Sequence, residues 1–392
     1  MIQLLEIGLV ALALFWAQQL LYKKIWNRNL KADISFASDH IFEGDKGYLN
    51  EVIENGKRLP LSMLKVKFQT NRNLIFHVSK GSRTTDQYYR NDIFHVAGGE
   101  KVTRTIPFTG GKRGYYSITE LELVASDLFL TVEMPYAFPI QKNFYVYPKP
   151  FYSRELHQSL QQLNGEILTK RNLLEDPFEY RGIREYQPFD DIRSINWKAT
   201  ARTGDLKVNQ HNYTSLPSIR IFFNIEDDGV LKRDEAVEAC FRIVAGLCRY
   251  FLGQGIQVSC FGNGRDILTD EIVRITSSAG NGQMEQILRT LARIDTGKPV
   301  ADFVKCFQEE LLERSDRASM TFLVSPHQYE PFVKLIERLQ ESGKNYYWYY
   351  PVWDNADPKL PAGLEKHIGL LHLQSITDLS VNSTSRASEY DA

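Results

Sequence analysis

The sequence predicts a mixed α/β protein with one transmembrane helix, an N-terminal β-sandwich and a C-terminal doubly wound α/β domain. Three observations lead to this prediction. A long apolar run lies at the start of the chain. Residues 32–150 alternate apolar and polar side chains between turn dipeptides, which is typical of half-buried strands. From residue 217, short apolar runs alternate with longer runs of helical period, which indicates a parallel sheet covered by helices.

Length and composition agree with this organisation. The 392 residues exceed one ordinary hydrophobic core and fit two domains plus an additional segment. A hydrophobic content of 43% and a charged content of 24% are those of a globular protein and leave no room for extensive disorder. The net charge of −1, without a block of basic residues, argues against a nucleic-acid partner held by bulk electrostatics.

Residues 1–26 are predicted to be a membrane anchor. The uncharged run 7–22, with its flank, reaches the roughly 20 residues that a bilayer-spanning helix needs. A secretory signal would carry a basic start and a small-residue cleavage site, and the segment has neither. A buried amphipathic helix is the alternative. Because Lys23, Lys24, Arg28 and Lys31 follow at once, we expect a single-pass protein of the cell membrane with its domains in the cytoplasm.

Residues 32–150 are predicted to form an immunoglobulin- or fibronectin-like β-sandwich. Strand patterns of period two are separated by turn dipeptides such as Asn55-Gly56 and Gly98-Gly99. No helical period interrupts them. The strand patterns include residues 64–68, 74–78, 102–106 and 121–124.

Residues 151–216 are predicted to be a helical connector followed by an unusual charged and aromatic stretch. Leu156, Leu160 and Leu163 have helical spacing. Residues 178–208 then alternate charges of both signs with aromatic side chains, which suits a partly buried set of paired ions. The planar guanidinium groups of Arg184, Arg193 and Arg202 are expected to form ion pairs with the carboxylates of Glu185, Asp190 and Asp191.

Capping and turn residues within 178–208 predict a short helix and a strand. Asp190 or Asp191 is expected to cap the helix, which would turn Ile192, Ile195 and Ala199 inward. The turn 203–205 then leads into a strand that begins with Leu206 and Val208.

Residues 217–380 are predicted to be the α/β domain, and residues 381–392 a loose polar tail. Four cysteines in this domain have apolar neighbours and are expected to be unpaired core residues, which suits a reducing compartment. The run Gly262-Asn263-Gly264 is predicted to be a turn. Predicted strands lie at 219–223, 256–261, 321–324 and 346–350, and predicted helices at 232–252, 281–294, 301–315 and 330–342.

The run 182–202, Gly-Ile-Arg-Glu-Tyr-Gln-Pro-Phe-Asp-Asp-Ile-Arg-Ser-Ile-Asn-Trp-Lys-Ala-Thr-Ala-Arg, resembles the signature of the domain of unknown function 58 (DUF58) family. Phe189 stands where that family usually has glycine. The family is bacterial and membrane-associated. The resemblance implies a von Willebrand factor A-like domain over 217–380, and MoxR-type AAA+ ATPases and transglutaminase-like membrane proteins as partners. The residues that carry the signature are Arg184, Glu185, Tyr186, Asp190, Asp191, Arg193, Trp197 and Arg202.

An A-domain resemblance also implies a magnesium site, built from Asp-x-Ser-x-Ser after the first strand and an Asp after a later one. Here Asn224 replaces the first Asp, and Glu226 and Asp228 replace the serines. The later strand is followed by Ser325, without the Asp. A hard cation needs more oxygen ligands than this, so we expect a solvated acidic loop and no cofactor. A rearranged site using Glu226 and Asp228 is the alternative.

Two function classes follow. The chain carries no Gly-x-Ser-x-Gly, Gly-x-x-x-x-Gly-Lys or His-Glu-x-x-His motif, which favours a non-enzymatic interaction or scaffold protein. In that case the signature residues are expected to form a clamp between the two domains, with Trp197 packed in a core. The alternative is a metal-dependent hydrolase using Asp190, Asp191, Glu226 and Asp228.

Overall fold

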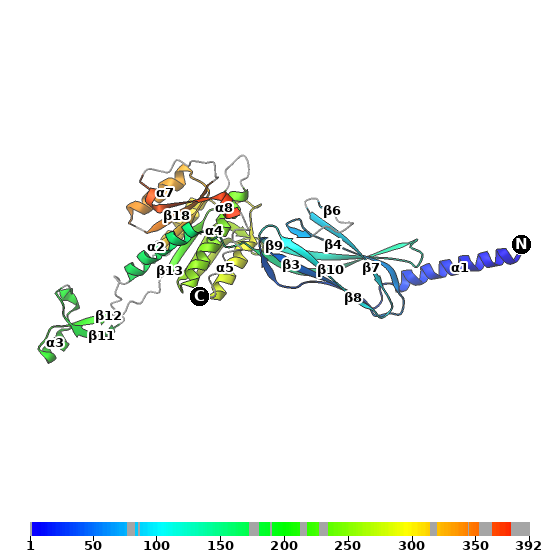
Figure 1. The fold of residues 1–392 in the computed structure, drawn as a ribbon, viewed down its shortest axis with the longest axis horizontal. Helices are drawn as coiled ribbons and strands as arrows, with labels where there is room; N and C mark the ends of the chain where they lie inside the picture. Colours follow the sequence, from blue (N-terminus) through cyan, green and yellow to red (C-terminus); the bar gives the residue numbers. More distant parts are fainter. Residues whose placement is uncertain are drawn as a thin grey trace. The chain divides into compact units, whose positions relative to one another are not determined.

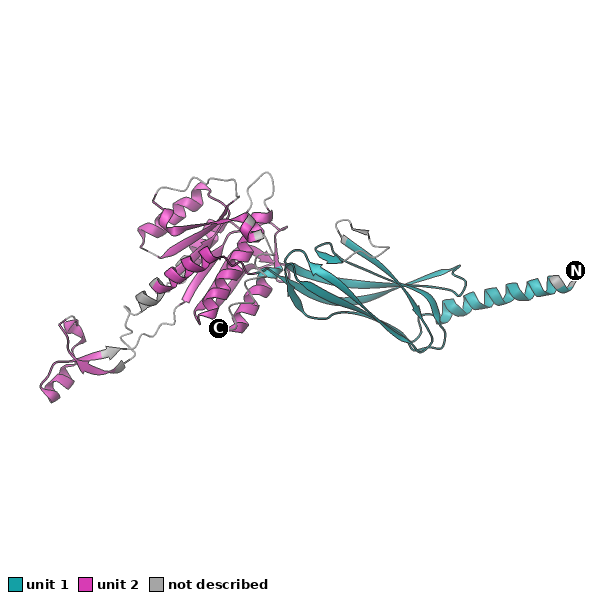
Figure 2. Ribbon diagram, viewed as in Figure 1, with its two compact units in different colours: residues 1–149, 291–293 teal, residues 150–290, 294–392 magenta. Residues whose placement is uncertain are grey.

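The computed structural model describes residues 2–76, 83–84, 87–171, 180–188, 190–211, 218–226, 234–313, 320–343, 345–352 and 363–377. The chain divides into two compact units, which Figure 2 distinguishes by colour. Unit 1 comprises residues 1–149 with 291–293, and unit 2 comprises residues 150–290 with 294–392. The tail 381–392 expected to be loose lies outside the described residues.

Unit 1 begins with the apolar helix α1 (Ile2–Ile25), labelled in Figure 1. Its segment Leu5–Ile25 is long and apolar enough to cross a membrane. Most of its large side chains are exposed, among them Leu9 and Trp16. The apolar helix that the sequence predicts is therefore present.

Two sheets make up the rest of unit 1. One has the strand order β1-β3-β8-β5 and the other β2-β10-β9-β4-β7-β6. Their pairs are antiparallel, apart from the parallel pair β2 and β10. The bounds are β1 (Leu30–Phe36), β2 (His40–Phe42), β3 (Lys46–Asn55), β4 (Leu61–Asn71), β5 (Leu74–Phe76), β6 (Arg83–Thr84), β7 (Gln87–Val96), β8 (Lys101–Gly110), β9 (Gly114–Ser126) and β10 (Glu133–Tyr147).

Both sheets of unit 1 contribute to one hydrophobic core. Leu49 and Ile106 reach it from the smaller sheet, and Val66 and Leu123 from the larger one. Buried residues alternate with exposed or half-buried ones along β3, as the period-two pattern predicts. The alternation between residues 32 and 150 is therefore the consequence of strands with one face in a shared core.

This core also holds charged side chains. Glu51 on β3 is fully buried, and Arg90 and Asp92 on β7 are nearly so. Asp92 accepts hydrogen bonds from Arg90 and from Arg104 Nη1, the latter at 3.1 Å. Burial and the charge of Asp92 raise the pKa of Glu51 to about 8, although Arg90 and Arg104 oppose the change. Glu51 is thus protonated in the folded unit at neutral pH.

Unit 2 is built on a mixed sheet with the order β15-β14-β13-β17-β18-β19. The strands β13, β14, β17, β18 and β19 are parallel, whereas β15 and the short β16 run antiparallel to β14. The bounds are β13 (Ser218–Phe223), β14 (Gln257–Asp266), β15 (Ile272–Ser278), β16 (Ile294–Asp295), β17 (Met320–Val324), β18 (Tyr346–Val352) and β19 (Ile368–His372). The sequence patterns did not predict β15, β16 or β19.

Helices alternate with these strands along the chain (Figure 1). They are α2 (Arg154–Arg171), α4 (Asp234–Gly253), α5 (Asn281–Arg293), α6 (Phe303–Glu313), α7 (Glu330–Glu341) and α8 (Leu373–Thr377), with the 3-10 turn η2 (Glu365–His367). Every helix predicted in the α/β domain is present, with ends shifted by a few residues.

Helix α2 is part of unit 2 and not a free link. Leu156, Leu160 and Leu163 form a buried face, as their spacing predicts. The segment before α2 is fixed to α4, because Phe151 N donates to Arg242 O at 2.9 Å. A Cβ at Gly246 would lie 2.2 Å from Phe151 O, so only glycine permits this approach.

Candidate functional site

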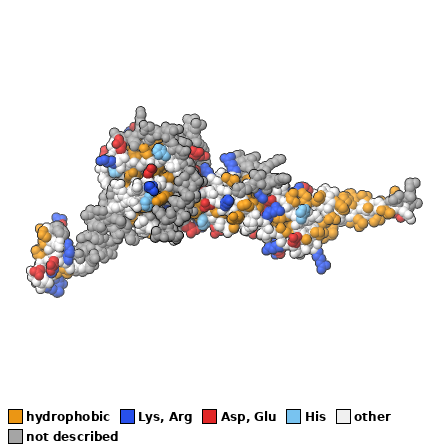
Figure 3. Space-filling view, viewed as in Figure 1, with side chains coloured by type: hydrophobic (Ala, Val, Ile, Leu, Met, Phe, Trp, Pro, Cys, Tyr) orange, Lys and Arg blue, Asp and Glu red, His pale blue; other side chains and the backbone are white. Residues whose placement is uncertain are grey.

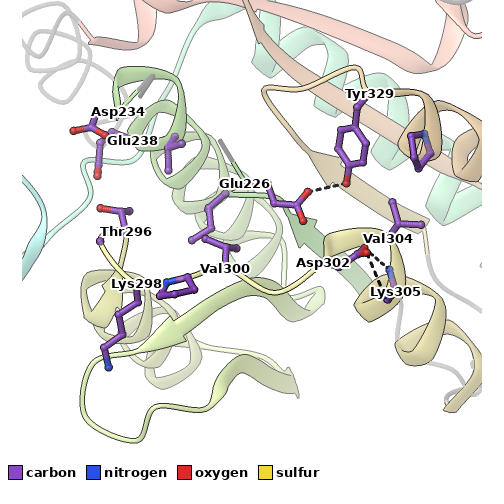
Figure 4. Close-up of a pocket in the computed structure, with 15 residues that line it drawn as sticks. Glu226, Asp234, Glu238, Thr296, Lys298, Val300, Asp302, Val304, Lys305 and Tyr329 are labelled. Carbon is purple, nitrogen blue, oxygen red and sulfur yellow. Dashed lines mark hydrogen bonds and ion pairs between the residues drawn. The ribbon is translucent and has the colours of Figure 1, made fainter. Parts of the chain in front are cut away.

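The candidate site lies where the strand order of unit 2 reverses. Strand β13 lies between β14 and β17. The chain passes from β13 to β14 on one side and later returns to β17 on the other side. Open α/β sheets bind ligands beyond the carboxyl ends of their strands at such a point. A cavity of about 800 Å³ lies there, lined by Glu226 after β13, by Tyr329 before α7 and by the first residues of α4 and α6 (Figure 4).

A network of neutral side chains closes the inner end of the site. Asn224, Asn263 and Ser325 are fully buried; Asn224 and Ser325 directly follow β13 and β17, and Asn263 lies within the neighbouring strand β14. Asn263 Nδ2 donates to Asn224 Oδ1 at 2.9 Å, and Asn224 Nδ2 donates to Ser325 Oγ at 3.3 Å. Asn263 Oδ1 accepts from Ile225 N at 3.0 Å. The network holds the chain that leaves β13 in a fixed position.

Asn263 corrects the prediction of a turn at 262–264, since these residues belong to β14. A Cβ at Gly262 would lie 2.2 Å from the Phe223 ring, and one at Gly264 would lie 2.5 Å from Ile225 Cδ1. Glycine inside a strand marks such close approaches. The Gly-Asn-Gly run was therefore the signal for this part of the site.

Glu226 links two helices. Its Oε2 accepts from the Tyr329 hydroxyl at 2.8 Å (Figure 4), and its Oε1 accepts from Phe303 N at the start of α6 at 2.8 Å. A carboxylate at a helix N-terminus is stabilised by the exposed N–H groups and the helix dipole. Glu226 thus positions α6 and the segment before α7 around the cavity.

The rim of the cavity carries charges of both signs. Lys298 Nζ lies 2.7 Å from Asp270 Oδ1, and Lys305 Nζ lies 3.8 Å from Asp302 Oδ2. Asp234 and Glu238 of α4 add two carboxyl groups to the lining. Val300 and Val304 give the cavity apolar surface between these groups. Such a lining suits a polar peptide segment with one or two apolar anchors.

The magnesium ligands implied by the A-domain resemblance do not fit this arrangement. Asn224 Oδ1 already accepts from Asn263 Nδ2 and from Glu226 N, the latter at 2.9 Å. Both oxygens of Glu226 accept hydrogen bonds as described above, and Asp228 lies outside the described residues. Within the described ranges, no group of three or more His, Cys, Asp or Glu could hold a metal ion.

We expect magnesium to leave the stability of unit 2 unchanged. A cation that bound the native state at this site would raise the melting temperature by mass action, and the side-chain oxygens of Asn224 and Glu226 already accept hydrogen bonds from protein donors. The measurement is a thermal melt of the full-length protein in millimolar magnesium, calcium or sodium at one ionic strength. A rise of several degrees in magnesium alone would contradict the prediction.

The signature residues form a separate small element, which we call the signature module (residues 180–211). Strands β11 (Tyr180–Glu185) and β12 (Lys207–His211) are antiparallel, and η1 (Ile192–Ser194) and α3 (Trp197–Thr203) lie between them in the chain. Arg184 binds Asp190 through two hydrogen bonds of 2.6 and 2.5 Å. These bonds from Arg184 lower the pKa of Asp190. The expected planar pairing is present at this pair.

Other signature residues make separate local contacts within the module. Asp191 Oδ1 caps η1 by accepting from Arg193 N at 2.9 Å, as the sequence predicts for Asp190 or Asp191. Glu185 pairs with Lys207 at 3.1 Å. Tyr186 N donates to Leu206 O. The turn expected at 203–205 is centred on Gly204, which has φ 81° and ends α3.

The predicted packing of Trp197 is wrong for this structure. Trp197 is 64% exposed and Ile192 is 68% exposed, and Arg193 and Arg202 are exposed as well. The described apolar side chains that the module buries are Ile195 and Val208, which face each other in an isolated bridge. Two strands and a seven-residue helix provide too little volume to bury an indole ring.

The four acidic residues of the hydrolase alternative therefore differ in their positions and contacts. Glu226 lines the cavity and caps α6, whereas Asp190 pairs with Arg184 and Asp191 caps η1. Asp228 lies outside the described residues, as does Phe189.

Comparisons with known proteins give one informative match. Two of the solved structures that resemble part of the chain are Spo0M, a sporulation control protein from Bacillus subtilis, and a β-glucosidase from Listeria innocua in complex with glucose. Identities are 14% and 10%, and the matches cover 29% and 30% of this chain. They span only 49% and 16% of those proteins, with a TM-score of 0.17 in both cases, so neither bears on the fold.

No curated protein matches the chain. A family model described as a protein of unknown function, DUF58, matches residues 182–375, which include most of the signature module and the lining of the cavity. Residues 182–375 of this chain are therefore similar to the DUF58 family.

Proposed function

We propose that the chain is a membrane-anchored, non-enzymatic interaction protein whose α/β unit binds a protein partner in the cavity beyond β13. In this proposal α1 is a single-pass anchor of the cell membrane, and the lysines after its apolar run keep both units in the cytoplasm. Unit 1 is an immunoglobulin- or fibronectin-like β-sandwich, and unit 2 is a von Willebrand factor A-like domain. The shared core of the two sheets and the strand order of unit 2 support these assignments.

The observation that carries the proposal is the chemistry of the cavity. Where A-type domains bind a metal, this chain has the neutral Asn224–Asn263–Ser325 network, and Glu226 holds α6. These groups make a shaped and rigid surface and leave the cavity open to a partner. A volume of about 800 Å³ accommodates several side chains of a peptide segment.

The signature module is proposed as a second contact for the same partner. An exposed tryptophan beside exposed arginines is the composition of a binding hot spot, and Trp197 stands near Arg193 and Arg202 in the sequence. A two-stranded element with so few buried apolar residues gains stability when it packs against another surface. That surface is proposed to belong to the partner. The clamp between the two units remains the alternative for this module.

The proposed partner is a MoxR-type AAA+ ATPase at the membrane. The DUF58 match supports this proposal, because the family that the signature resembles is linked with such ATPases and with transglutaminase-like membrane proteins. The chain would then act as the scaffold that holds the ATPase beside its membrane substrates.

The test is cross-linking and affinity capture of the full-length protein from native membranes. Val304→Arg places a long charged side chain in the cavity and is expected to reduce capture of the partner at least about tenfold. Gln308→Arg is the matched control, since it lies one turn further along α6, is also half-exposed and does not line the cavity. Mass spectrometry identifies the captured protein.

Two outcomes would count against the proposal. Equal capture by the wild type and Val304→Arg, with both proteins folded by protease resistance, would remove the cavity as the binding site. Capture of a protein that is not an AAA+ ATPase, lost in Val304→Arg, would retain the site and replace the proposed partner.

A further inference from the structure

One face of the second half of helix α1 packs against the rest of unit 1. The face consists of Phe15, Gln18, Gln19 and Tyr22, where Gln18 and Gln19 each lie three or four residues from Phe15 and from Tyr22, and it continues into Trp26 directly after the helix. Gln18 Nε2 donates to Asp127 Oδ2 at 2.8 Å, and Gln19 Nε2 donates to Thr131 Oγ1 at 3.0 Å. The rings of Phe15 and Phe129 lie 5.6 Å apart. The segment joining β9 to β10, residues 127–131, is therefore bound to the helix well before its C-terminal end.

The length of α1 determines how deep this segment lies. A spanning helix needs roughly 20 residues to cross a hydrocarbon core about 30 Å thick. The segment of α1 that is long and apolar enough to cross, Leu5–Ile25, includes the contact residues Phe15, Gln18 and Gln19. If α1 crosses the bilayer, its contact region must also enter the membrane, and residues 127–131 must enter with it.

The composition of residues 127–131 suits that environment. Leu128, Phe129 and Leu130 are consecutive and are 50%, 58% and 56% exposed. Three such side chains in water form the kind of apolar patch that normally has a partner. Leu130 also has a φ of 60°, a strained conformation for a bulky residue, which commonly marks a functional position. Figure 3 shows the hydrophobic side chains that cover the neighbouring helix.

Several polar groups of the segment are paired within the protein. The carboxylate of Asp127 accepts from Thr131 N at 2.6 Å, Thr131 Oγ1 at 2.8 Å and Val132 N at 3.0 Å, in addition to Gln18. Leu130 N donates to Asp127 O at 3.1 Å. Irregular backbone enters a membrane only when such groups have partners within the protein.

We infer that residues 127–131 are a second membrane-binding element, which inserts Leu128, Phe129 and Leu130 into the leaflet beside α1. The inference rests on the proposed anchoring by α1. Trp26 and Tyr136, whose rings lie 6.3 Å apart, stand at the level of the headgroups, where aromatic side chains are enriched. Lys23, Lys24 and Arg28 then meet the anionic headgroups. Helix and loop together fix the orientation of unit 1 on the membrane surface.

The test places a fluorescent nitrobenzoxadiazole probe on the loop of the full-length protein. The probe is attached through Phe129→Cys, with Leu128→Cys as a second loop position. The native cysteines are free but buried, so the introduced thiol is the accessible one. Ile75→Cys is the control, since Ile75 is 50% exposed on β5. Ile75 lies at the end of the sheet that is far from α1. Its strand β5 pairs with the end of β8, whereas β1, which follows α1, begins beside the end of β3. Because β3 and β8 are antiparallel, these two ends lie at opposite edges of the sheet.

The labelled proteins are reconstituted into phosphatidylcholine vesicles containing phosphatidylglycerol. Lipids with a nitroxide on the acyl chain are expected to quench the probe at positions 128 and 129 by about half or more and to leave the probe at position 75 unaffected. Aqueous iodide should give the reverse order. Equal iodide quenching at all three positions would overturn the inference. Protection from both quenchers at positions 128 and 129 would also overturn it, because a second copy of the chain would then cover the loop.

Alkaline carbonate separates this inference from the proposed anchoring. Release of the full-length wild type from the vesicles would overturn the anchoring by α1. A protein that stays with the vesicles, yet shows no lipid quenching at positions 128 and 129, would overturn only the role of the loop.

Discussion

The unfolding free energy of unit 1 is expected to fall by about 3–4 kcal/mol between pH 5 and pH 8, and most of this dependence should vanish in Glu51→Gln. The folded unit holds the Glu51 proton up to a pKa of about 8, because the side chain is buried and lies near the charge of Asp92. The unfolded chain loses that proton at the usual value of 4.5. Between these values the native state binds more protons, so rising pH favours unfolding.

The measurement is pulse proteolysis in urea on the full-length protein in detergent, with the surviving fragment of unit 1 followed from pH 5 to pH 8. Glu54→Gln is the matched control, since Glu54 lies on the same strand but is partly exposed and pairs with Lys31 at 3.8 Å. That variant should retain the pH dependence of the wild type. The prediction fails if Glu51→Gln and the wild type lose stability in parallel.

Asn263→Ala is expected to destabilise unit 2 by about 3 kcal/mol, because it removes hydrogen bonds from three polar groups in the network. Ile225 N and Ala301 O lose the Asn263 side chain as a partner, and Asn224 Oδ1 keeps only Glu226 N; the three groups lie 2.9 to 3.0 Å from the Asn263 amide. A buried donor or acceptor that loses its partner costs about 1–3 kcal/mol. The chain after β13 would also be released, and the cavity would lose its shape.

The same urea series, read on the fragment of unit 2, measures this loss. Gln308→Ala is the comparison, since a half-exposed helical side chain should change the stability by no more than about 0.5 kcal/mol. A loss below about 1 kcal/mol in Asn263→Ala would show that the amide network contributes little, because the partners would then have found other hydrogen bonds.

Several features of the fold could be predicted from the sequence because they depend on local patterns. The apolar run of α1, the period of α4 and the alternation of β3 each reflect one face of one element. Capping is equally local, since Asp191 and Gly204 act on residues within a few positions of themselves. The Arg184–Asp190 pair is separated by only six residues. The sequence pattern therefore determined most of the elements, their order and the Arg184–Asp190 pair of the signature module.

The antiparallel strand β15 could not be predicted from such local patterns. It is a short, half-buried edge strand, and its direction depends on the side of β14 to which the chain returns. A short apolar run does not carry that information. The exposure of Trp197 was missed for a similar reason, since an aromatic residue among charges fits both a core and a binding surface.

The tertiary structure decided the groups that carry the proposals. Asn224 meets Ser325 across 101 residues of chain, Glu226 meets Tyr329 across 103, and Gln18 meets Asp127 across 109. The pKa of Glu51 is raised because the packed sheets bury its side chain and because the other sheet places the charge of Asp92 near it. The free energy of a polar side chain depends on which partners and how much water surround it, and the packing of distant segments determines both.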